Sequence, residues 1–416
     1  MKKLNEKIIN RQTVLLTELL DTLTPRVIER GHPADRVLSQ FFKNRRELGS
    51  RDRRFLSEAF FSFFRWYGWT LKAGLDMPEA AALSWLLDRT DIHPALESLL
   101  RPDWEPLGGK TLEEKRTALA GWNDGFQTLE KSDLVFPMFG KSVELPAGCE
   151  DRFYETLQQR PPTWLRLRSD AFRQVLTDAG IVFQLHPKLM DVVSVEGGVS
   201  LGALGHGGQF EVQDIASQAV VRIADPAVGS DWWDACCGAG GKSIQLADRI
   251  GPSGRVLATD VRENALRECK KRARTDGIQM IRTQPHNLAE EAPFTKEFDG
   301  VLVDAPCSGW GTWSRNPDAR WRSDPRDPTG KRNLQVRMLA NAAQCVKPGG
   351  VLVFAVCTFT REETAEVVER FCAAHPAFSP EEFVNPLTGE KAARTLQIWP
   401  WEGPGDGMFA ARFRKA

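Results

Sequence analysis

Residues 228–243, VGSDWWDACCGAGGKS, decide the class of fold. The apolar part of this stretch predicts a β-strand, and a helix is expected over 241–250, with a glycine-rich loop between them. Gly238, Gly240 and Gly241 allow the backbone to turn tightly and to approach a ligand. The helix also begins with free N–H groups at that point. We therefore expect a ligand at the junction of this strand and this helix.

The same alternation of strand and helix continues toward the C-terminus. From about residue 209 onward, short Val- and Leu-rich runs are separated by longer stretches of helical periodicity. This pattern predicts a parallel sheet with helices on both faces, and such sheets bind ligands at the carboxyl ends of their strands. The expected strands are 255–260, 278–284, 298–304 and 349–356, and the expected helices are 262–276, 330–346 and 361–374.

Two nucleotide-binding motifs compete for the glycine loop. A Walker A loop needs GxxxxGK[ST], and its first glycine position is occupied here by Cys236. The Rossmann-type motif fits better, because Asp260 ends the next strand 22 residues after Gly238, where an acid can bind ribose hydroxyls. A glycine loop and an acid fit NAD enzymes and S-adenosylmethionine (SAM) enzymes alike, and a turn without a ligand is the structural alternative.

Two cysteines end neighbouring strands of the predicted sheet. Cys307 lies in DAPCSG (304–309), and Cys357 lies in AVCT (355–358). If these strands are adjacent, both thiols face one pocket. A helix dipole and nearby cations at such a position are expected to lower the pKa of a thiol and to favour the nucleophilic thiolate.

At these residues the sequence resembles the RNA cytosine-5 methyltransferases (the Sun/Fmu family, NOL1/NOP2 type). The resemblance covers about residues 150–416, and the helical first 75 residues are similar to the NusB-like RNA-binding module of the bacterial 16S rRNA members. The matching stretches are VQDIASQ (212–218), DACCGAGGK (234–242), DAPCSG (304–309), GTWSRNPDARWR (311–322), CVKPGGVLVFAVCTFTREE (345–363) and DGMFAARFRK (406–415).

The resemblance implies a multidomain protein. We expect a helical NusB-like RNA-binding domain over 1–145, a small α+β insert domain over 146–208, and a Rossmann-like α/β SAM-dependent methyltransferase domain over 209–416. The expected cofactor is SAM. The residues implied in binding it are Cys236, Cys237, Gly238, Ala239, Gly240, Gly241, Lys242, Asp260, Asn287 and Asp304.

The resemblance also implies a covalent mechanism. The Cys357 thiolate would add to C6 of cytosine, which makes C5 nucleophilic toward the SAM methyl group. Asp304 would hydrogen-bond the exocyclic amine and the protonated N3 of the base, and Cys307 would assist loss of the C5 proton and release of the enzyme. The target base must be unpaired or flipped into the pocket. The role of Lys242 stays open.

Three departures from the family pattern affect the expected site. Cys237, Gly238 and Ala239 stand where the family loop has Ala-Ala-Pro, which lowers the rigidity of the loop. Val356 stands where a Thr or Ser precedes the nucleophile. Asn287 stands where an acid commonly faces the adenine, and an amide can still donate and accept hydrogen bonds there.

RNA contacts are expected from Arg and Trp side chains in the loop that follows Cys307. The alternative is a solvated loop whose Trp residues pack inward. The residues assigned to RNA are Arg315, Arg320, Arg322 and Trp313. A second candidate patch consists of Arg160, Arg166, Arg168 and Arg173.

Charge is distributed unevenly along the chain. The 416 residues carry 55 Lys+Arg and 55 Asp+Glu, and the formal net charge of +0 argues against a uniformly basic nucleic-acid-coating protein. Residues 1–75 hold 15 Lys+Arg against 8 Asp+Glu, whereas residues 76–150 hold 7 against 14. The basic face of the first segment either contacts RNA or is a solvated surface.

The remaining composition excludes several classes of protein. Eight scattered Cys without a CxxC, together with six His, predict neither a disulfide scaffold nor a metal site. The start, MKKLNEKIIN, lacks the apolar region of a signal peptide, and no apolar run is long enough to span a membrane. We expect a cytoplasmic monomer that methylates RNA, with 16S rRNA as the first candidate substrate.

The alternatives that stay open are the same reaction on tRNA and an RNA-binding ribosome assembly factor without catalytic activity. A small-molecule SAM methyltransferase leaves the cysteine pair and the Arg- and Trp-rich loop unexplained.

Overall fold

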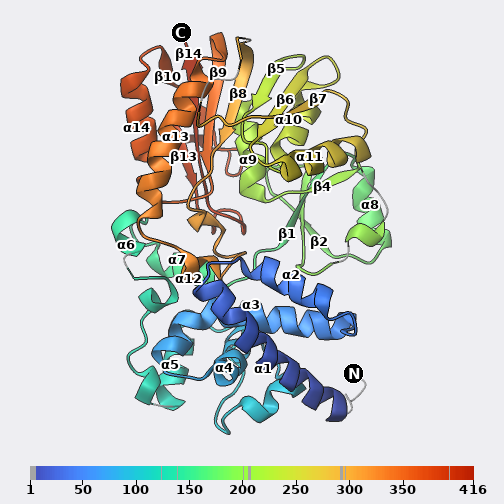
Figure 1. Cartoon of the computed structure of the whole chain (residues 1–416), viewed down its shortest axis with the longest axis vertical. Coiled ribbons are helices and arrows are strands. Elements are labelled where there is room, and N and C mark those ends of the chain that lie inside the picture. Colours follow the sequence, from blue (N-terminus) through green and yellow to red (C-terminus); the bar gives the residue numbers. More distant parts are fainter. Residues whose placement is uncertain are drawn as a thin grey trace. The chain divides into compact units, whose positions relative to one another are not determined.

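The computed structural model describes residues 6–122, 124–137, 139–199, 201–204, 208–290, 294–295, 297–392 and 394–416, apart from the side chains of residues 203 and 392 (Figure 1). The described chain divides into two compact units. The helical unit contains the described residues of Met1–Lys141, Leu145–Arg160 and Trp313–Pro325. The sheet unit contains those of Ser142–Glu144, Pro161–Thr312 and Arg326–Ala416. The division into three domains at residues 145 and 208 stays a prediction.

The helical unit is built from amphipathic helices around one apolar core. On α1, Leu16, Leu19, Leu20 and Leu23 recur at helical spacing and are fully buried. Asp76 caps α4 by accepting a hydrogen bond from the Glu79 N–H. The helices are α1 (Glu6–Ile28), α2 (Ala34–Asn44), α3 (Ser50–Lys72), α4 (Met77–Asp88), α5 (Leu112–Trp122), α7 (Glu150–Leu157) and α12 (Ala319–Arg322), and α6 (Phe139–Ser142) ends at the unit boundary.

A small antiparallel sheet opens the sheet unit. Its strands are β1 (Thr163–Leu167), β2 (Phe183–Leu185), β3 (Val192–Val195) and β4 (Phe210–Val212), in the spatial order β2-β3-β1-β4. Helix α8 (Ala171–Asp178) covers this sheet through Phe172 and Leu176, which pack on Leu165 and Val193.

The large sheet has the spatial order β10-β14-β9-β8-β5-β6-β7, and β13 also pairs with β14. Strands β7, β6, β5, β8 and β9 run parallel, and β14 is antiparallel to β9. The strands are β5 (Asp231–Asp234), β6 (Arg255–Asp260), β7 (Ile281–Pro285), β8 (Phe298–Asp304), β9 (Val346–Val356), β10 (Phe378–Pro380), β13 (Thr395–Ile398) and β14 (Met408–Lys415), while β11 (Phe383–Val384) and β12 (Lys391–Ala392) form a separate pair.

Helices cover both faces of the large sheet, as Figure 1 shows. Alternate residues of β8 point to opposite faces, so that Val301 and Val303 pack with one set of helices and Leu302 packs with the other. Helices α13 (Asp327–Ala343) and α14 (Ala365–Ala374) cover the first face. Helices α9 (Ile215–Ala224) and α10 (Gly241–Ile250) cover the second face, and α11 (Glu263–Thr275) packs on β6 through Leu266 and Cys269.

The predicted fold class is confirmed. A Rossmann-like α/β sheet, a small α+β region and an N-terminal all-helical region are all present. The strand expected over 228–235 is confined to β5, and the helix expected over 330–346 begins earlier, at Asp327. Among the described residues, no helix has the length and apolarity needed to cross a membrane.

Candidate functional site

A cavity of about 810 Å³ lies at the carboxyl ends of β5, β6, β8 and β9. This volume is within the range of small-molecule sites. Most of the residues that the sequence nominates line this cavity, although they are spread over more than 120 positions of the chain. These are Cys236, Cys237, Gly238, Ala239, Gly241, Lys242, Asp260, Asn287, Asp304, Cys307 and Cys357.

The glycine loop forms one wall of the cavity. Gly238 and Gly240 adopt φ values of 54° and 87°, which residues with a Cβ rarely adopt. A Cβ on Gly240 would also lie 2.4 Å from the Cys269 Sγ on α11. Gly240 is not among the lining residues, so its glycine is required by the turn and by the approach of α11 to the loop.

Asp260 is held by the loop and by an arginine that the sequence reasoning missed. It accepts hydrogen bonds from the Gly238 N–H at 2.9 Å and the Arg262 N–H at 2.9 Å, and the Arg262 guanidinium contacts both carboxylate oxygens at 2.9 and 3.0 Å. Burial acts to raise the pKa of Asp260, but the bonds from Arg262 and Gly238 outweigh it and lower that pKa. The carboxylate is therefore ionised and accepts hydroxyl donors well. The available signal was a basic residue two positions after a strand-end acid.

Asn287 borders the cavity just beyond β7. Its side chain donates to the Glu290 Oε1 at 2.7 Å and accepts from the Ala289 N–H at 3.2 Å. The amide therefore shapes the turn that forms this edge of the cavity.

Asp304 and Lys242 form an ion pair, with Nζ 2.7 Å from Oδ2. Burial opposes the ammonium charge, but the neighbouring Asp304 carboxylate outweighs it and raises the pKa of Lys242. Asp234 lies fully buried nearby and accepts a 2.6 Å hydrogen bond from the Ser243 hydroxyl. Burial raises the pKa of Asp234 to about 7.

The two thiols nominated from the strand ends lie together. The Cys307 and Cys357 Sγ atoms are 3.3 Å apart, and both residues line the cavity. The expectation of a lowered thiol pKa is wrong for Cys357. Its hydrogen bond with Cys307 and its burial raise the pKa well above the ordinary value. Lys242, the cation of this part of the cavity, is paired with the Asp304 carboxylate.

Two of the four residues assigned to RNA lie in the core of the helical unit, so that assignment is wrong for them. Trp313 is fully buried and packs on Phe136 and Phe139, with ring centroids 5.8 and 5.4 Å away. Arg320 is also fully buried and donates to the carbonyl oxygens of Leu134, at 3.2 Å, and Leu157.

The other two residues of this loop differ in exposure. Arg322 is bonded to Asp318 at 2.9 Å, which ties it to its own short helix α12. Arg315 is exposed, and its contact with RNA stays a prediction.

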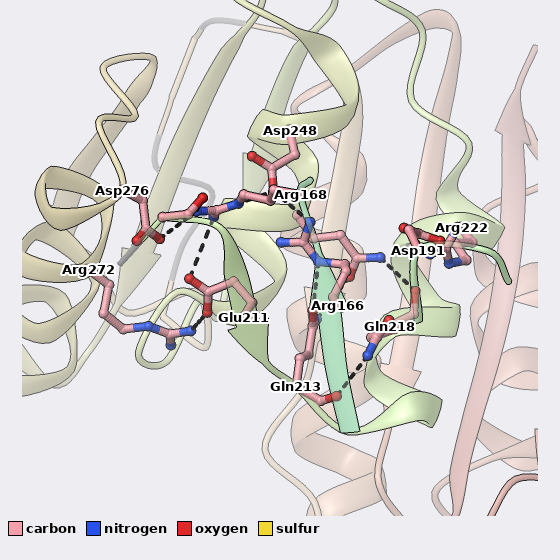
Figure 2. A network of polar contacts seen from close by, with 12 residues as sticks. Arg166, Arg168, Asp191, Glu211, Gln213, Gln218, Arg222, Asp248, Arg272 and Asp276 are labelled. Carbon is pink, nitrogen blue, oxygen red and sulfur yellow. Dashed lines mark hydrogen bonds and ion pairs between the residues drawn. The ribbon is translucent and has the colours of Figure 1, made fainter. Parts of the chain in front are cut away.

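Part of the second candidate patch is also internal, and Figure 2 shows the polar contacts of its residues. Arg166 is 4% exposed and bonds to Asp248 on α10 at 2.6 Å. Arg168 bonds to Asp248 at 2.9 Å and to Asp276, just after α11, at 3.0 Å. Both arginines therefore join the small sheet to helices of the large sheet, and their assignment to RNA is wrong.

The rest of the second patch is peripheral. Arg173 contacts Asp170 at 3.1 Å, and Arg160 is exposed. In the ranges that the structure describes, no group of three or more His, Cys, Asp or Glu could hold a metal ion.

Comparisons with known proteins agree on one family. Residues 221–414 match the family of the 16S rRNA methyltransferase RsmB/F. The probable ribosomal RNA small subunit methyltransferase B of Bacillus subtilis is 34% identical over 215 residues, which are 50% of this chain and 48% of that protein. The ribosomal RNA small subunit methyltransferase B of Yersinia pseudotuberculosis is 32% identical over 269 residues, which are 62% of this chain and 60% of that protein. The chain thus spans about half to three fifths of these relatives.

Solved structures share the fold. PH0851 superposes with a TM-score of 0.75 over 99% of both chains, at 19% identity. NSun6 from Pyrococcus horikoshii, crystallised with SFG, has a TM-score of 0.57 and 15% identity, and covers 64% of this chain and 94% of its own. A methyltransferase homolog protein from Pyrococcus horikoshii has a TM-score of 0.56 and 23% identity, and covers 65% and 92% of the two chains.

Proposed function

We propose, on the premise that residues 221–414 match the family of the 16S rRNA methyltransferase RsmB/F, that the chain methylates C5 of a cytosine in 16S rRNA with SAM as methyl donor. One observation carries the proposal. Two thiols, Cys307 and Cys357, lie 3.3 Å apart at one end of a cavity whose other end holds a strand-end carboxylate, Asp260. Cytosine C5 methylation needs one sulfur that bonds to the base and a second group that helps to release it.

The cofactor end of the cavity fits SAM. Bound there, SAM supplies an electrophilic methyl group on its sulfonium. The ionised Asp260 would accept hydrogen bonds from the ribose hydroxyls, and the backbone at Gly238 permits close approach. NSun6, which shares this fold, was crystallised with SFG, a SAM analogue. This supports the proposal that the cavity binds SAM.

The cysteine end would act on the base. Cys357 loses its proton, and its sulfur forms a bond to C6, which shifts electrons onto C5. C5 then takes the methyl group. Asp304, held by Lys242 at 2.7 Å, would accept hydrogen bonds from the exocyclic amine and from N3 in its protonated form. Cys307 would take the C5 proton, and the returning electron pair breaks the bond between sulfur and C6.

The raised pKa of Cys357 has a consequence for this scheme. The thiol stays protonated at neutral pH, so a proton acceptor is needed before it attacks. The Cys307 sulfur, 3.3 Å away, is within reach of that proton, and it would have to pass the proton to solvent before it takes the C5 proton. The reaction should therefore speed up as the pH rises above neutrality.

The test measures methyl transfer and locates the methylated nucleotide in the RNA. Purified protein is incubated with methyl-labelled SAM and unmodified 16S rRNA, and the RNA is then analysed by bisulfite sequencing. We expect label in the RNA and one protected cytosine. Transfer to tRNA alone would favour the tRNA alternative, and RNA binding without transfer would favour an inactive assembly factor.

A second experiment tests whether Cys357 forms the adduct and Cys307 resolves it. Cys307→Ala should form the covalent adduct with RNA and fail to resolve it. A slow-migrating protein–RNA species on a denaturing gel is expected for this variant and not for the double variant that also lacks Cys357. Absence of the adduct in Cys307→Ala would contradict the release role.

A further inference from the structure

A buried carboxylate that does not line the cavity lies behind the two thiols. Glu363 is 0% exposed and follows β9 six residues after Cys357. Its Oε1 accepts from the Ser308 N–H at 2.9 Å and from the Gln335 side-chain amide at 3.0 Å. Its Oε2 accepts from the Thr360 hydroxyl at 2.9 Å and from the Ser308 hydroxyl. Burial raises the pKa of Glu363, which these bonds oppose.

The donors of this cluster flank both cysteines. Ser308 follows Cys307 directly, and its hydroxyl is 2.9 Å from the hydroxyl of Thr358, which follows Cys357 directly. Gln335 on α13 also donates to the carbonyl oxygen of Pro306 at 3.0 Å. Glu363 therefore connects the residues before and after Cys307 to the residue after Cys357.

The two cysteines depend on this cluster unequally. Cys357 directly follows β9, whose last residues pair with β8 on one side and β14 on the other. Cys307 lies three residues beyond the end of β8, in a loop without strand pairing. The Glu363 cluster is what fixes Ser308 and Pro306 on either side of it.

We propose that Glu363 is a positioning residue that holds the Cys307 loop so that its sulfur stays beside Cys357. This inference rests on the proposed function, in which Cys357 forms the adduct and Cys307 resolves it. A carboxylate suits the position because it is an acceptor at both oxygens, and donors from three segments point at it. Loss of the carboxylate should therefore impair release of the adduct more than its formation.

The test compares Glu363→Gln with Cys307→Ala and wild type. The amide presents an N–H₂ group to donors and loses one acceptor, so the Ser308 contacts weaken while the side-chain volume is kept. We expect kcat to fall about 10- to 100-fold, as misplacement of a catalytic group by about 1 Å does. The covalent adduct should accumulate on a denaturing gel, and the Kd for SAM should stay unchanged.

Matched variants keep the result interpretable. Glu369→Gln removes an exposed carboxylate from α14 and should behave as wild type. Ser308→Ala removes only the hydroxyl contacts and should accumulate adduct to a smaller extent. If Glu363→Gln does not fold, the Ser308→Ala variant alone tests the positioning role. If Cys307→Ala accumulates adduct while Glu363→Gln and Ser308→Ala do not, the positioning role is refuted. If Cys307→Ala forms no adduct either, the proposed function itself fails.

Discussion

The two ends of the cavity are built on different principles. At the cysteine end, the fully buried Glu363 is surrounded by neutral donors from the adjoining loops and α13, so its contacts cannot exchange with water. At the cofactor end, the partner of Asp260 is Arg262, whose side chain is 64% exposed. The difference matches the proposed roles: a group that would take part in covalent chemistry has fixed neighbours, whereas a carboxylate that would bind an exchanging cofactor is paired with a side chain that can move away.

The largest expected effect is at the cysteine end. Cys357→Ala should lower methyl transfer by at least about 10³-fold, because it removes the nucleophile and with it the covalent route. Transfer is measured with labelled SAM, and SAM binding should persist because Asp260 and the glycine loop are untouched. Cys372→Ala on α14 is the matched control. If Cys357→Ala transfers methyl groups at the wild-type rate, Cys357 is not the nucleophile.

A pH experiment tests Asp234, the buried acid in the lining of the cavity. Burial raises the pKa of Asp234 to about 7 in the folded protein from its ordinary value of 3.8, so the folded state binds more protons than the unfolded state between these values. Its contribution to the free energy of unfolding should therefore fall as the pH rises from about 4 to about 7, by up to about 1.4 kcal/mol per pH unit, and then stay level.

The comparison for this prediction is Asp234→Asn, which retains an acceptor for the Ser243 hydroxyl. Urea unfolding of both proteins at several pH values gives the difference in stability. Wild type should lose stability relative to the variant as the pH rises. A difference that does not change with pH would show that the burial of Asp234 does not shift its titration.

At the cofactor end, Asp260→Asn should weaken SAM binding. Hydrogen bonds to a charged group contribute about 1.5–3 kcal/mol, so a loss of about 10- to 100-fold in affinity is expected, with transfer restored at saturating SAM. Isothermal titration with SAM measures it, and Glu263→Gln, an exposed acid nearby, is the control. Unchanged affinity would mean that the ribose does not reach this carboxylate.

The smallest effect is expected from Arg262→Met. The direction of the change in SAM affinity tests whether Arg262 blocks Asp260 or binds the cofactor. The guanidinium occupies both oxygens of Asp260 and must leave before ribose hydroxyls can bind. An exposed ion pair contributes up to about 1 kcal/mol, so SAM affinity should rise about two- to fivefold without it. Arg267→Met on the exposed face of α11 is the control. Weaker binding would instead make Arg262 a ligand of the cofactor.

Local patterns predicted most of the sheet and the lining of the cavity. The alternation of Val- and Leu-rich strands with helical stretches, together with the glycines at 238 and 240, depends on backbone preferences that act over a few residues. Because carboxyl ends of parallel strands meet at one edge, Asp260, Asp304, Cys307 and Cys357 could be assigned to one site. Glu363 was missed because its partners Ser308 and Gln335 come from distant segments of the chain. Arg262 was missed although it lies only two residues after Asp260.

Local patterns did not predict which arginine and tryptophan side chains are buried. The sequence by itself determined the class of fold, the succession of strands and helices along the chain and the residues that reach the strand ends, because each depends on neighbours along the chain. Only the tertiary structure decided that Arg320 donates to the carbonyl oxygens of Leu134 and Leu157 and that Arg166 is paired with Asp248. It also decided that Cys307 and burial raise the pKa of Cys357. Burial and charge pairing depend on residues that are far apart in the sequence. The sequence pattern around an arginine therefore does not distinguish a side chain that faces water from one that donates to a buried carbonyl oxygen.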